Sequence, residues 1–201
     1  KQNTFPIESK LDLEKTPLPC LKLMGAHHNR RRPYRPALVN ISAMSYGALS
    51  KATKTSMGKA SAMVGTSTNT GEGGMLPEER AAAKHLIYQI TPGRFGFNIH
   101  DLRRADAVEF YISQGAKPGK GGILPAAKVT AEIARIRGIP EGKDCYSPNA
   151  HSEFDTVDEM IDFIESIADR TGLPVGVKSA IGKMDFWYEL AERMRDRKEG
   201  P

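Results

Sequence analysis

The sequence is poor in cysteine and contains no long apolar run. Its two cysteines, Cys20 and Cys145, lie far apart and lack the spacing of metal ligands. This excludes a disulfide framework and an iron–sulfur site within the segment. No apolar stretch approaches the ~20 residues of a membrane span, and the N-terminal residues lack a signal-peptide pattern. We therefore expect a cytoplasmic location and no membrane partner.

A nucleic-acid-binding function has little support. The net charge is +5, and part of the excess lies in one basic run, residues 27–35. This run has no reading motif and lacks a pattern of interleaved aromatic residues, with Tyr34 as its one aromatic ring besides the histidines, so we expect no nucleic-acid partner. A run of this kind is typical of a solvated arm or of an arm docked on a partner. The glycine-rich stretch 113–125 lacks the Gly-Lys-Ser/Thr ending of a phosphate-binding loop, which disfavours a nucleoside triphosphate site.

What the chain does contain is an alternation of short apolar runs with helix-period segments from residue 37 onward. Residues 1–36 are rich in Pro, Lys and Arg, and we predict that they form an N-terminal arm before a main domain of residues 37–201. The alternation predicts an α/β fold with a parallel sheet covered by helices, either a (β/α) barrel or a doubly wound sheet. Strands are predicted at 37–41, 108–112 and 174–178, and helices at about 51–64, 77–84, 130–137, 157–170 and 186–194.

The helix predictions depend on local signals at the helix ends. Ser50 is placed as an N-cap and Gly65 as a stop for the first long helix, and Gly138 ends the helix at 130–137. Thr156 with Glu159 makes a capping box before an apolar stripe at helical spacing. This stripe predicts the best-defined helix of the chain.

Four polar clusters follow predicted strands, where parallel barrels carry their functional residues. The first, residues 42–50, has small residues that let backbone amides approach a flat ligand, with Met44 placed to pack on it. In the second, residues 67–74, Glu72 stands among three glycines and is expected to face a bound group. The alternatives are an ordinary strand-to-helix loop and a flexible loop.

The other two clusters contain lysines. In residues 113–125, Lys117 lies in a glycine frame that suits a carboxylate, a phosphate or an electron-rich ring. Lys178 ends a predicted strand near the mouth of the sheet, where burying it requires an anionic partner. The alternative for Lys178 is a side chain that extends into solvent. His151, in residues 147–151, is more typical of an exposed or structurally bonded histidine than of a catalytic one.

Taken in order, four blocks resemble the FMN-binding synthase domain of glutamate synthases and their shorter relatives. The blocks are Ser-Ala-Met-Ser-Tyr-Gly-Ala-Leu-Ser, Asn-Thr-Gly-Glu-Gly-Gly, Gly-Arg-Phe-Gly at 93–96 and Ser-Gln-Gly-Ala-Lys-Pro-Gly. The resemblance implies a (β/α)₈ barrel with FMN at its C-terminal mouth. It also implies an oxidoreductase that reductively aminates 2-oxoglutarate, or a related 2-oxo acid, with ammonia or an amine.

The resemblance assigns roles to individual residues. Glu72 and Lys117 are the expected catalytic residues, with Glu72 assisting proton transfer, and Lys178 is favoured over Lys117 to stabilise negative charge on the flavin. The expected cofactor-binding residues are Met44, Ser45, Gly47, Asn69, Gln114 and Lys178. The expected substrate-binding residues are Gln114, Lys117 and Arg137, whose guanidinium matches a carboxylate. No resident metal ion is expected.

Two residues depart from full glutamate synthases. Tyr111 stands three residues before Gln114, where those enzymes typically have a lysine, and Ile123 stands where they tend to have a glutamine. The departures weaken the implied specificity for a dicarboxylate, and the short relatives include N-methylglutamate synthase subunits.

The later segments of the family, with their flavin-phosphate loops and iron–sulfur cysteines, are not found in this sequence. We therefore expect the N-terminal part of an incomplete barrel, from a truncated or split chain. An iron–sulfur cluster would have to come from the missing C-terminal region or from a partner. The implied partners are an electron-donor protein, a glutaminase or other amine-supplying subunit, and further copies in an oligomer. The alternative is a non-catalytic fragment or subunit that completes a barrel with a partner chain.

Overall fold

The computed structural model describes residues 23–26, 30–116 and 121–201 and contains a four-stranded parallel sheet. The strands are β1 (Ser67–Asn69), β2 (His85–Ile90), β3 (Ala107–Tyr111) and β6 (Val175–Lys178), and they pair in the order β1-β2-β3-β6. All of their pairings are parallel, so their carboxyl ends meet at one edge. This confirms the predicted α/β fold with a parallel sheet, which is open within the described residues, as in part of a (β/α) barrel.

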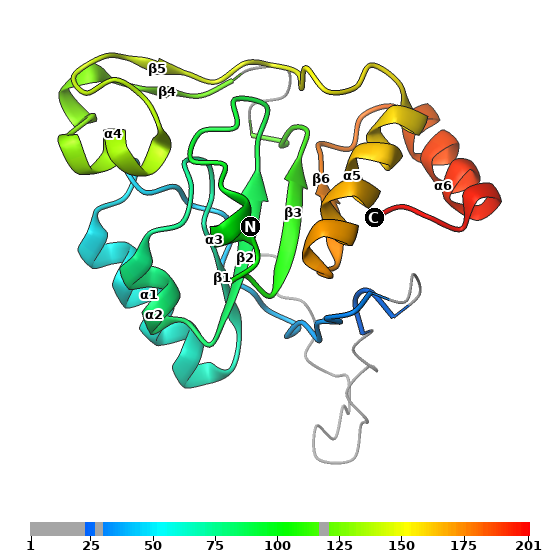
Figure 1. Cartoon of the computed structure of the whole chain (residues 1–201), viewed down its shortest axis with the longest axis horizontal. Helices are drawn as coiled ribbons and strands as arrows, with labels where there is room; N and C mark the ends of the chain where they lie inside the picture. The colour runs from blue at the N-terminus through cyan, green and yellow to red at the C-terminus, as the bar shows by residue number, and fades with distance from the viewer. Residues whose placement is uncertain (1–22, 27–29, 117–120) are drawn as a thin grey trace, which may run out of the picture.

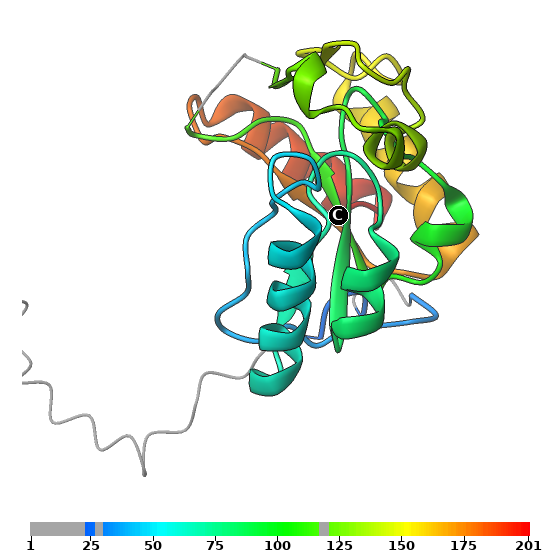
Figure 2. The ribbon, with the colours of Figure 1, turned by 90° about the vertical axis from the view of Figure 1, so that its left-hand side faces the viewer.

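Helices cover one face of the sheet. The longer ones are α1 (Lys51–Val64), α5 (Val157–Thr171) and α6 (Asp185–Arg197), and the shorter ones are α2 (Pro77–Ala82), α3 (Ile99–Leu102) and α4 (Ala131–Arg137). A 3₁₀ turn, η1 (Ala126–Lys128), lies between the short strands β4 (Ile123–Leu124) and β5 (Cys145–Tyr146), which pair antiparallel. This hairpin and α4 extend across the end of the sheet to which the strands point (Figures 1 and 2).

The main core lies between the sheet and α5. Tyr88 and Phe110 are buried there from β2 and β3, against Met160, Ile161 and Ile164 of α5. Successive strand residues point to opposite faces, so Gln89, Glu109, Tyr111 and Lys178 face away from this core. The side chains available for ligand binding therefore come from the opposite face and from the loops at the carboxyl edge.

The predicted helix ends are confirmed. Ser50 caps α1 by accepting from the amide of Thr53, and Gly65 ends the helix at φ +73°. Thr156 and Glu159 form the full capping box of α5. Cap signals are local, because the donors they satisfy lie within one turn, and this is why the sequence shows them.

The strand predicted at 37–41 is wrong. The amide of Ile41 donates to the carbonyl of Ser67 at 3.0 Å, but the segment forms no strand. Asn40 instead donates its side-chain amide to the carbonyl of Ala37 at 2.8 Å, which turns the backbone, and Val39 is 80% exposed. A local side-chain bond thus competes with the backbone ladder. No strand was predicted at the residues of β2, and the residues of β1 were predicted to belong to a turn.

The basic run docks on the chain itself. Arg30 makes a bidentate ion pair with Glu165 of α5 at 2.6 and 2.7 Å, and Arg32 donates to the carbonyls of Arg103 and Ala105. Arg30 and Arg32 therefore bond to other parts of the same chain. The division of the chain at residue 36 stays a prediction.

Candidate active site

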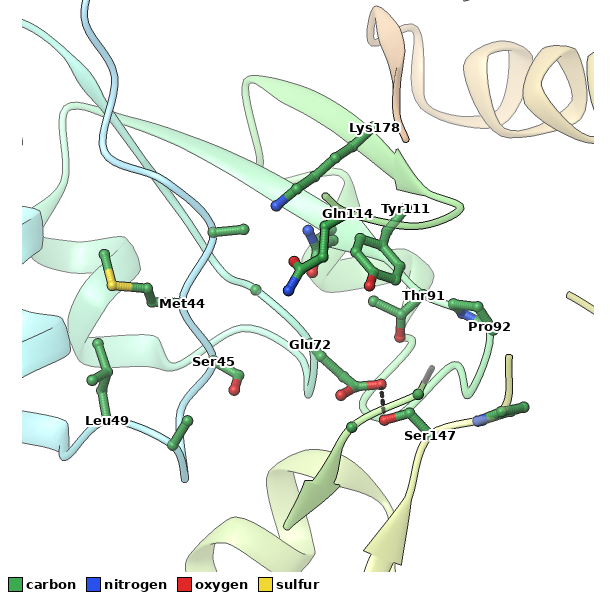
Figure 3. A pocket seen from close by; sticks show the side chains of 17 residues that line it. Met44, Ser45, Leu49, Glu72, Thr91, Pro92, Tyr111, Gln114, Ser147 and Lys178 are labelled. Carbon is green, nitrogen blue, oxygen red and sulfur yellow. Dashed lines mark hydrogen bonds between the residues drawn. The ribbon is translucent and has the colours of Figure 1, made fainter. Parts of the chain in front are cut away.

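A cavity of about 250 Å³ lies at the carboxyl edge of the sheet. Segments far apart in the sequence line it: the loop before α1, the turn after β1, the ends of β2, β3 and β6, and the β4–β5 hairpin. Figure 3 shows their side chains converging on one space. The lining residues with polar side chains are Ser45, Glu72, Gln89, Thr91, Tyr111, Gln114, Ser147 and Lys178.

Glu72 is held in place by the hairpin. Ser147 donates its hydroxyl to Glu72 Oε1 at 2.6 Å, and Figure 3 marks this bond. The amide of Ser147 also donates to the carbonyl of Gly122 at 2.8 Å, and the amide of Gly121 donates to Asn149 Oδ1 at 2.6 Å. The hairpin ends thus form one wall of the cavity and fix the orientation of the carboxylate.

Lys178 approaches the cavity from β6, in register with Tyr111 of β3. Its Nζ lies 3.9 Å from Glu109 Oε1 and 5.7 Å from the centroid of the Tyr111 ring. Gln89 donates to the same Glu109 oxygen at 2.5 Å. Burial, and then the charge of Glu72, raise the pKa of Tyr111, so its phenol stays protonated at neutral pH and can donate a hydrogen bond.

Of the nine predicted site residues, the structure brings five together in the cavity and places Gly47, Asn69 and Arg137 outside its lining. Those that line the cavity are Met44, Ser45, Glu72, Gln114 and Lys178. Gly47 turns the backbone at φ +105° beside Leu124, and Asn69 accepts the amide of Gly71 at 2.9 Å to shape the turn before Glu72. Lys117 lies outside the described residues. Contact of any of these residues with a cofactor or substrate stays a prediction.

Arg137 does not line the cavity, and the substrate-binding role expected for it stays a prediction. Its side chain is buried behind the wall, where Nη2 donates to the carbonyl of Tyr46 at 3.0 Å and to that of Glu72 at 3.4 Å. Nη1 lies 4.0 Å from the thiol of Cys145. The guanidinium thus bonds to the backbone of two site loops.

Sequence reasoning missed Gln89, Thr91 and Ser147 as lining residues. Gln89 lies near the end of β2 and Thr91 follows the strand, whose sequence, His-Leu-Ile-Tyr-Gln-Ile, is followed by Thr-Pro-Gly. A run rich in β-branched and aromatic residues with a turn signal behind it predicts a strand, so this signal was available. Ser147 lay in a recognised cluster, but its bond to Glu72 spans 75 residues and has no local signature.

His151 supports the carboxyl end of β3 from behind the cavity. It is 6% exposed, stacks on the rings of Phe110 and Phe154, and bonds through Nε2 to the carbonyl of Tyr111 at 2.7 Å. Burial lowers the pKa of His151 below 6.5, although the Tyr111 carbonyl and Glu153 oppose this shift. The sequence-based preference for a structurally bonded histidine fits this placement.

We expect the protein to lose stability in mild acid because of His151. The unfolded chain binds a proton near pH 6.5 and the folded chain does so only at lower pH. The contribution is therefore complete above pH 6.5 and is lost as the pH falls below it, by up to about 1.4 kcal/mol per pH unit. Urea unfolding at pH 7.5 and 5.5 should show a smaller pH difference in His151→Gln than in the wild type. The exposed His100→Gln is the control, and an unchanged pH difference in His151→Gln would contradict the prediction.

The described residues contain no group of three or more His, Cys, Asp or Glu side chains placed to hold a metal ion. Cys145 is a free, buried thiol, and Cys20 lies outside the described part of the chain. Among the residues with described positions, no helix is both long and apolar enough to cross a membrane.

Comparison with known proteins identifies the family. The model of the conserved region in glutamate synthase matches residues 8–186. A glutamate synthase large subunit-like protein of Rhizobium meliloti is 39% identical over 84% of this chain and 38% of its own length. An archaeal glutamate synthase (NADPH) of Methanocaldococcus jannaschii is 44% identical over 71% of this chain and 28% of its own length. The chain thus spans about a third of the length of these curated relatives.

Among solved structures, a mandelate oxidase mutant with a monooxide FMN adduct matches 81% of this chain and 45% of its own, at a TM-score of 0.44 and 18% identity. That similarity is too weak to carry an argument. The family match covers most of the chain, and the described residues of the four ordered motifs lie around the cavity or beside it. The chain therefore belongs to the glutamate synthase family.

Proposed function

We propose that this chain supplies part of the flavin and substrate site of a glutamate synthase-type oxidoreductase. The reaction is the FMN-dependent reductive amination of 2-oxoglutarate, or a related 2-oxo acid, with ammonia or an amine. The observation that carries the proposal is the convergence of Met44, Glu72, Gln114 and Lys178 on one cavity. These four residues come from four separate segments of the chain. Such convergence is expected of a binding site and is not expected of a single ordinary loop.

The cavity residues fit a flavin ring. At about 250 Å³ the cavity falls just below the ~300–1,000 Å³ range of small-molecule sites, so it suits the ring system rather than the whole nucleotide. Ala43, Met44 and Ala48 offer an apolar wall for a flat ligand, and Lys178 offers a cation. When bound, FMN supplies the hydride that reduces the substrate carbon–nitrogen double bond.

The residues of this chain hold and orient the flavin and the substrate. We assign Lys178 to the ring edge where reduction places negative charge, a position in which a cation is stabilising. The Gln114 amide donates to a substrate carboxylate or to the ring, and the neutral Tyr111 phenol is a further donor. Glu72, oriented by Ser147, exchanges a proton with the substrate nitrogen. Lys117 keeps its predicted role as a cation for substrate.

The names of the relatives support the reaction class. They are glutamate synthases, some of them described as NADPH-dependent. We propose that electrons come from a separate donor protein, and that a glutaminase or another amine-supplying subunit delivers the nitrogen. Any iron–sulfur cluster belongs to a partner or to a longer form of the chain.

The second candidate is a subunit that binds flavin only together with a partner chain. The observation that favours it is β6, which ends the order of paired strands and carries Lys178. An edge strand presents unpaired backbone groups to another strand. A partner strand beside β6 would complete the surroundings of Lys178.

Replacing Lys178 with methionine tests the site. We expect the dissociation constant for FMN, measured by quenching of flavin fluorescence, to rise at least tenfold, because the neutral side chain loses its attraction for the ring edge. Lys183→Met, an exposed lysine shortly after the same strand, is the matched control and should leave the constant unchanged.

Equal affinity in the wild type and Lys178→Met would refute the role of Lys178. No FMN binding by the wild-type chain under any condition would refute the first candidate. Binding that appears only after extension to the length of the relatives would favour the second.

A further inference from the structure

Lys54, in the second turn of α1, is 0% exposed. Lysine is rarely buried to this extent, because removing an ammonium from water costs several kcal/mol unless partners replace the lost hydration. The sequence reading assigned no function to this residue. Its burial requires a set of acceptors around Nζ, and the structure contains one.

The acceptors come from both sides of a junction. Lys54 Nζ donates to the carbonyl of Met44, in the loop before α1, and to the carbonyl of Asn69 at 2.8 Å, at the end of β1. Thr70 O lies at 3.4 Å, and Glu79 Oε1 forms an ion pair at 2.9 Å. An ammonium has three protons to donate. Met44, Asn69 and Glu79 satisfy them.

The two backbone segments joined by Lys54 both line the cavity. Met44 and Ser45 form part of its wall, and the turn after Asn69 carries Gly71 and Glu72. These segments touch at Gly71, where a Cβ atom would lie 2.5 Å from the nitrogen of Ser45 and 2.6 Å from the carbonyl carbon of Met44. No side chain separates them, so the ammonium beside the junction fixes their spacing.

Glu79 anchors the lysine from the other side. It is fully buried on α2, and Thr68 donates to the same Oε1 at 2.9 Å. Burial lowers the pKa of Lys54, while the charge of Glu79 opposes this shift. The pair lies behind the cavity wall, and neither side chain belongs to the lining. Lys54 therefore acts on the cavity only through backbone carbonyls.

We propose that Lys54 is a positioning residue that sets the distance between the Met44 wall and the turn bearing Glu72, and so controls ligand affinity without touching the ligand. The ligand part of this inference rests on the proposed function. The spacing part concerns this chain alone and can be measured without ligand.

The test uses the double variant Lys54→Met with Glu79→Gln, which leaves no unpaired buried charge. Amide hydrogen exchange should accelerate at least tenfold in residues 45–49 and 71–74, and less than twofold in α5. The dissociation constant for FMN should rise at least tenfold. The control Lys59→Met, at an exposed position of α1, should stay within threefold of the wild type in both measurements.

Acceleration of the same size in α5 would mean that Lys54 only stabilises the fold, and would overturn the proposal. If the double variant does not fold, hydrogen exchange of the wild type as a function of denaturant concentration tests the proposal instead. Its segments 45–49 and 71–74 should open with one common dependence on denaturant, and separate dependences would overturn the proposal. If the double variant shows the expected pattern of exchange but the wild type never binds FMN, the proposed function is refuted and the spacing role of Lys54 is still supported.

Discussion

An alanine at position 71 should lower the free energy of unfolding by about 3 kcal/mol. Gly71 has φ +63°, a conformation that costs a non-glycine residue about 1–2 kcal/mol. The new Cβ would also lie 2.5 Å from the backbone nitrogen of Ser45, and forcing the two segments apart adds roughly 1–3 kcal/mol. Urea unfolding measures the total loss in the free energy of unfolding. FMN titration measures the accompanying loss of affinity, which we expect to exceed tenfold because the wall of the cavity moves.

Gly65→Ala is the matched control for Gly71→Ala. Gly65 has φ +73°, similar to Gly71, but a Cβ there meets nothing within 4 Å. It should therefore cost only the conformational part, about 1–2 kcal/mol, and leave FMN affinity unchanged. If both variants lose the same stability and keep the same affinity, close contact at Gly71 is not what shapes the cavity.

Arg137→Met should destabilise the protein by about 2–4 kcal/mol, because it leaves the buried carbonyls of Tyr46 and Glu72 without their donor. Urea unfolding measures this loss. Arg135→Met, at an exposed position of the same helix, should change stability by less than about 0.5 kcal/mol.

The two roles considered for Arg137 predict different effects of Arg137→Met on the free energy of unfolding and on ligand binding. A substrate-binding arginine would, when replaced, weaken binding of the 2-oxo acid and preserve the free energy of unfolding. A positioning arginine would lose stability first, and FMN affinity would fall with it. A fully stable Arg137→Met that binds 2-oxoglutarate poorly would restore the role expected from the sequence.

Elements with local signals could be predicted from the sequence. The caps at Ser50 and Thr156 and the stops at Gly65 and Gly138 lie within one helical turn of the groups they satisfy, so α1, α4 and α5 were located to within two residues. The sheet was harder. β1 is three polar residues, Ser67–Asn69, all buried, and its sequence is typical of a turn. Only its pairing with β2 makes it a strand.

The site residues that lie in the sequence motifs could be predicted. Glu72 follows β1 and Lys178 ends β6 in a parallel sheet, and the carboxyl ends of such strands share an edge, so the convergence of these two residues follows from topology. Met44 lies in the same cavity although the strand predicted before it does not form. The position of Arg137 does not follow from topology. Whether a guanidinium faces a ligand or the backbone depends on which carbonyls lie near it, and Tyr46 is 91 residues away in the sequence. Lys54 went unnoticed for the same reason.

The docked arginines have a consequence for synthesis of the chain. Arg30 is made before its partners: Glu165, its carboxylate partner, follows 135 residues later, and the carbonyl of Gly200, another of its acceptors, follows 170 residues later. At roughly 5–20 residues per second, the ribosome takes on the order of ten seconds to supply that carboxylate. During this interval the basic segment has emerged without its native partner, next to the negatively charged ribosome. The ion pair between Arg30 and Glu165 can therefore form only after α5 has been made.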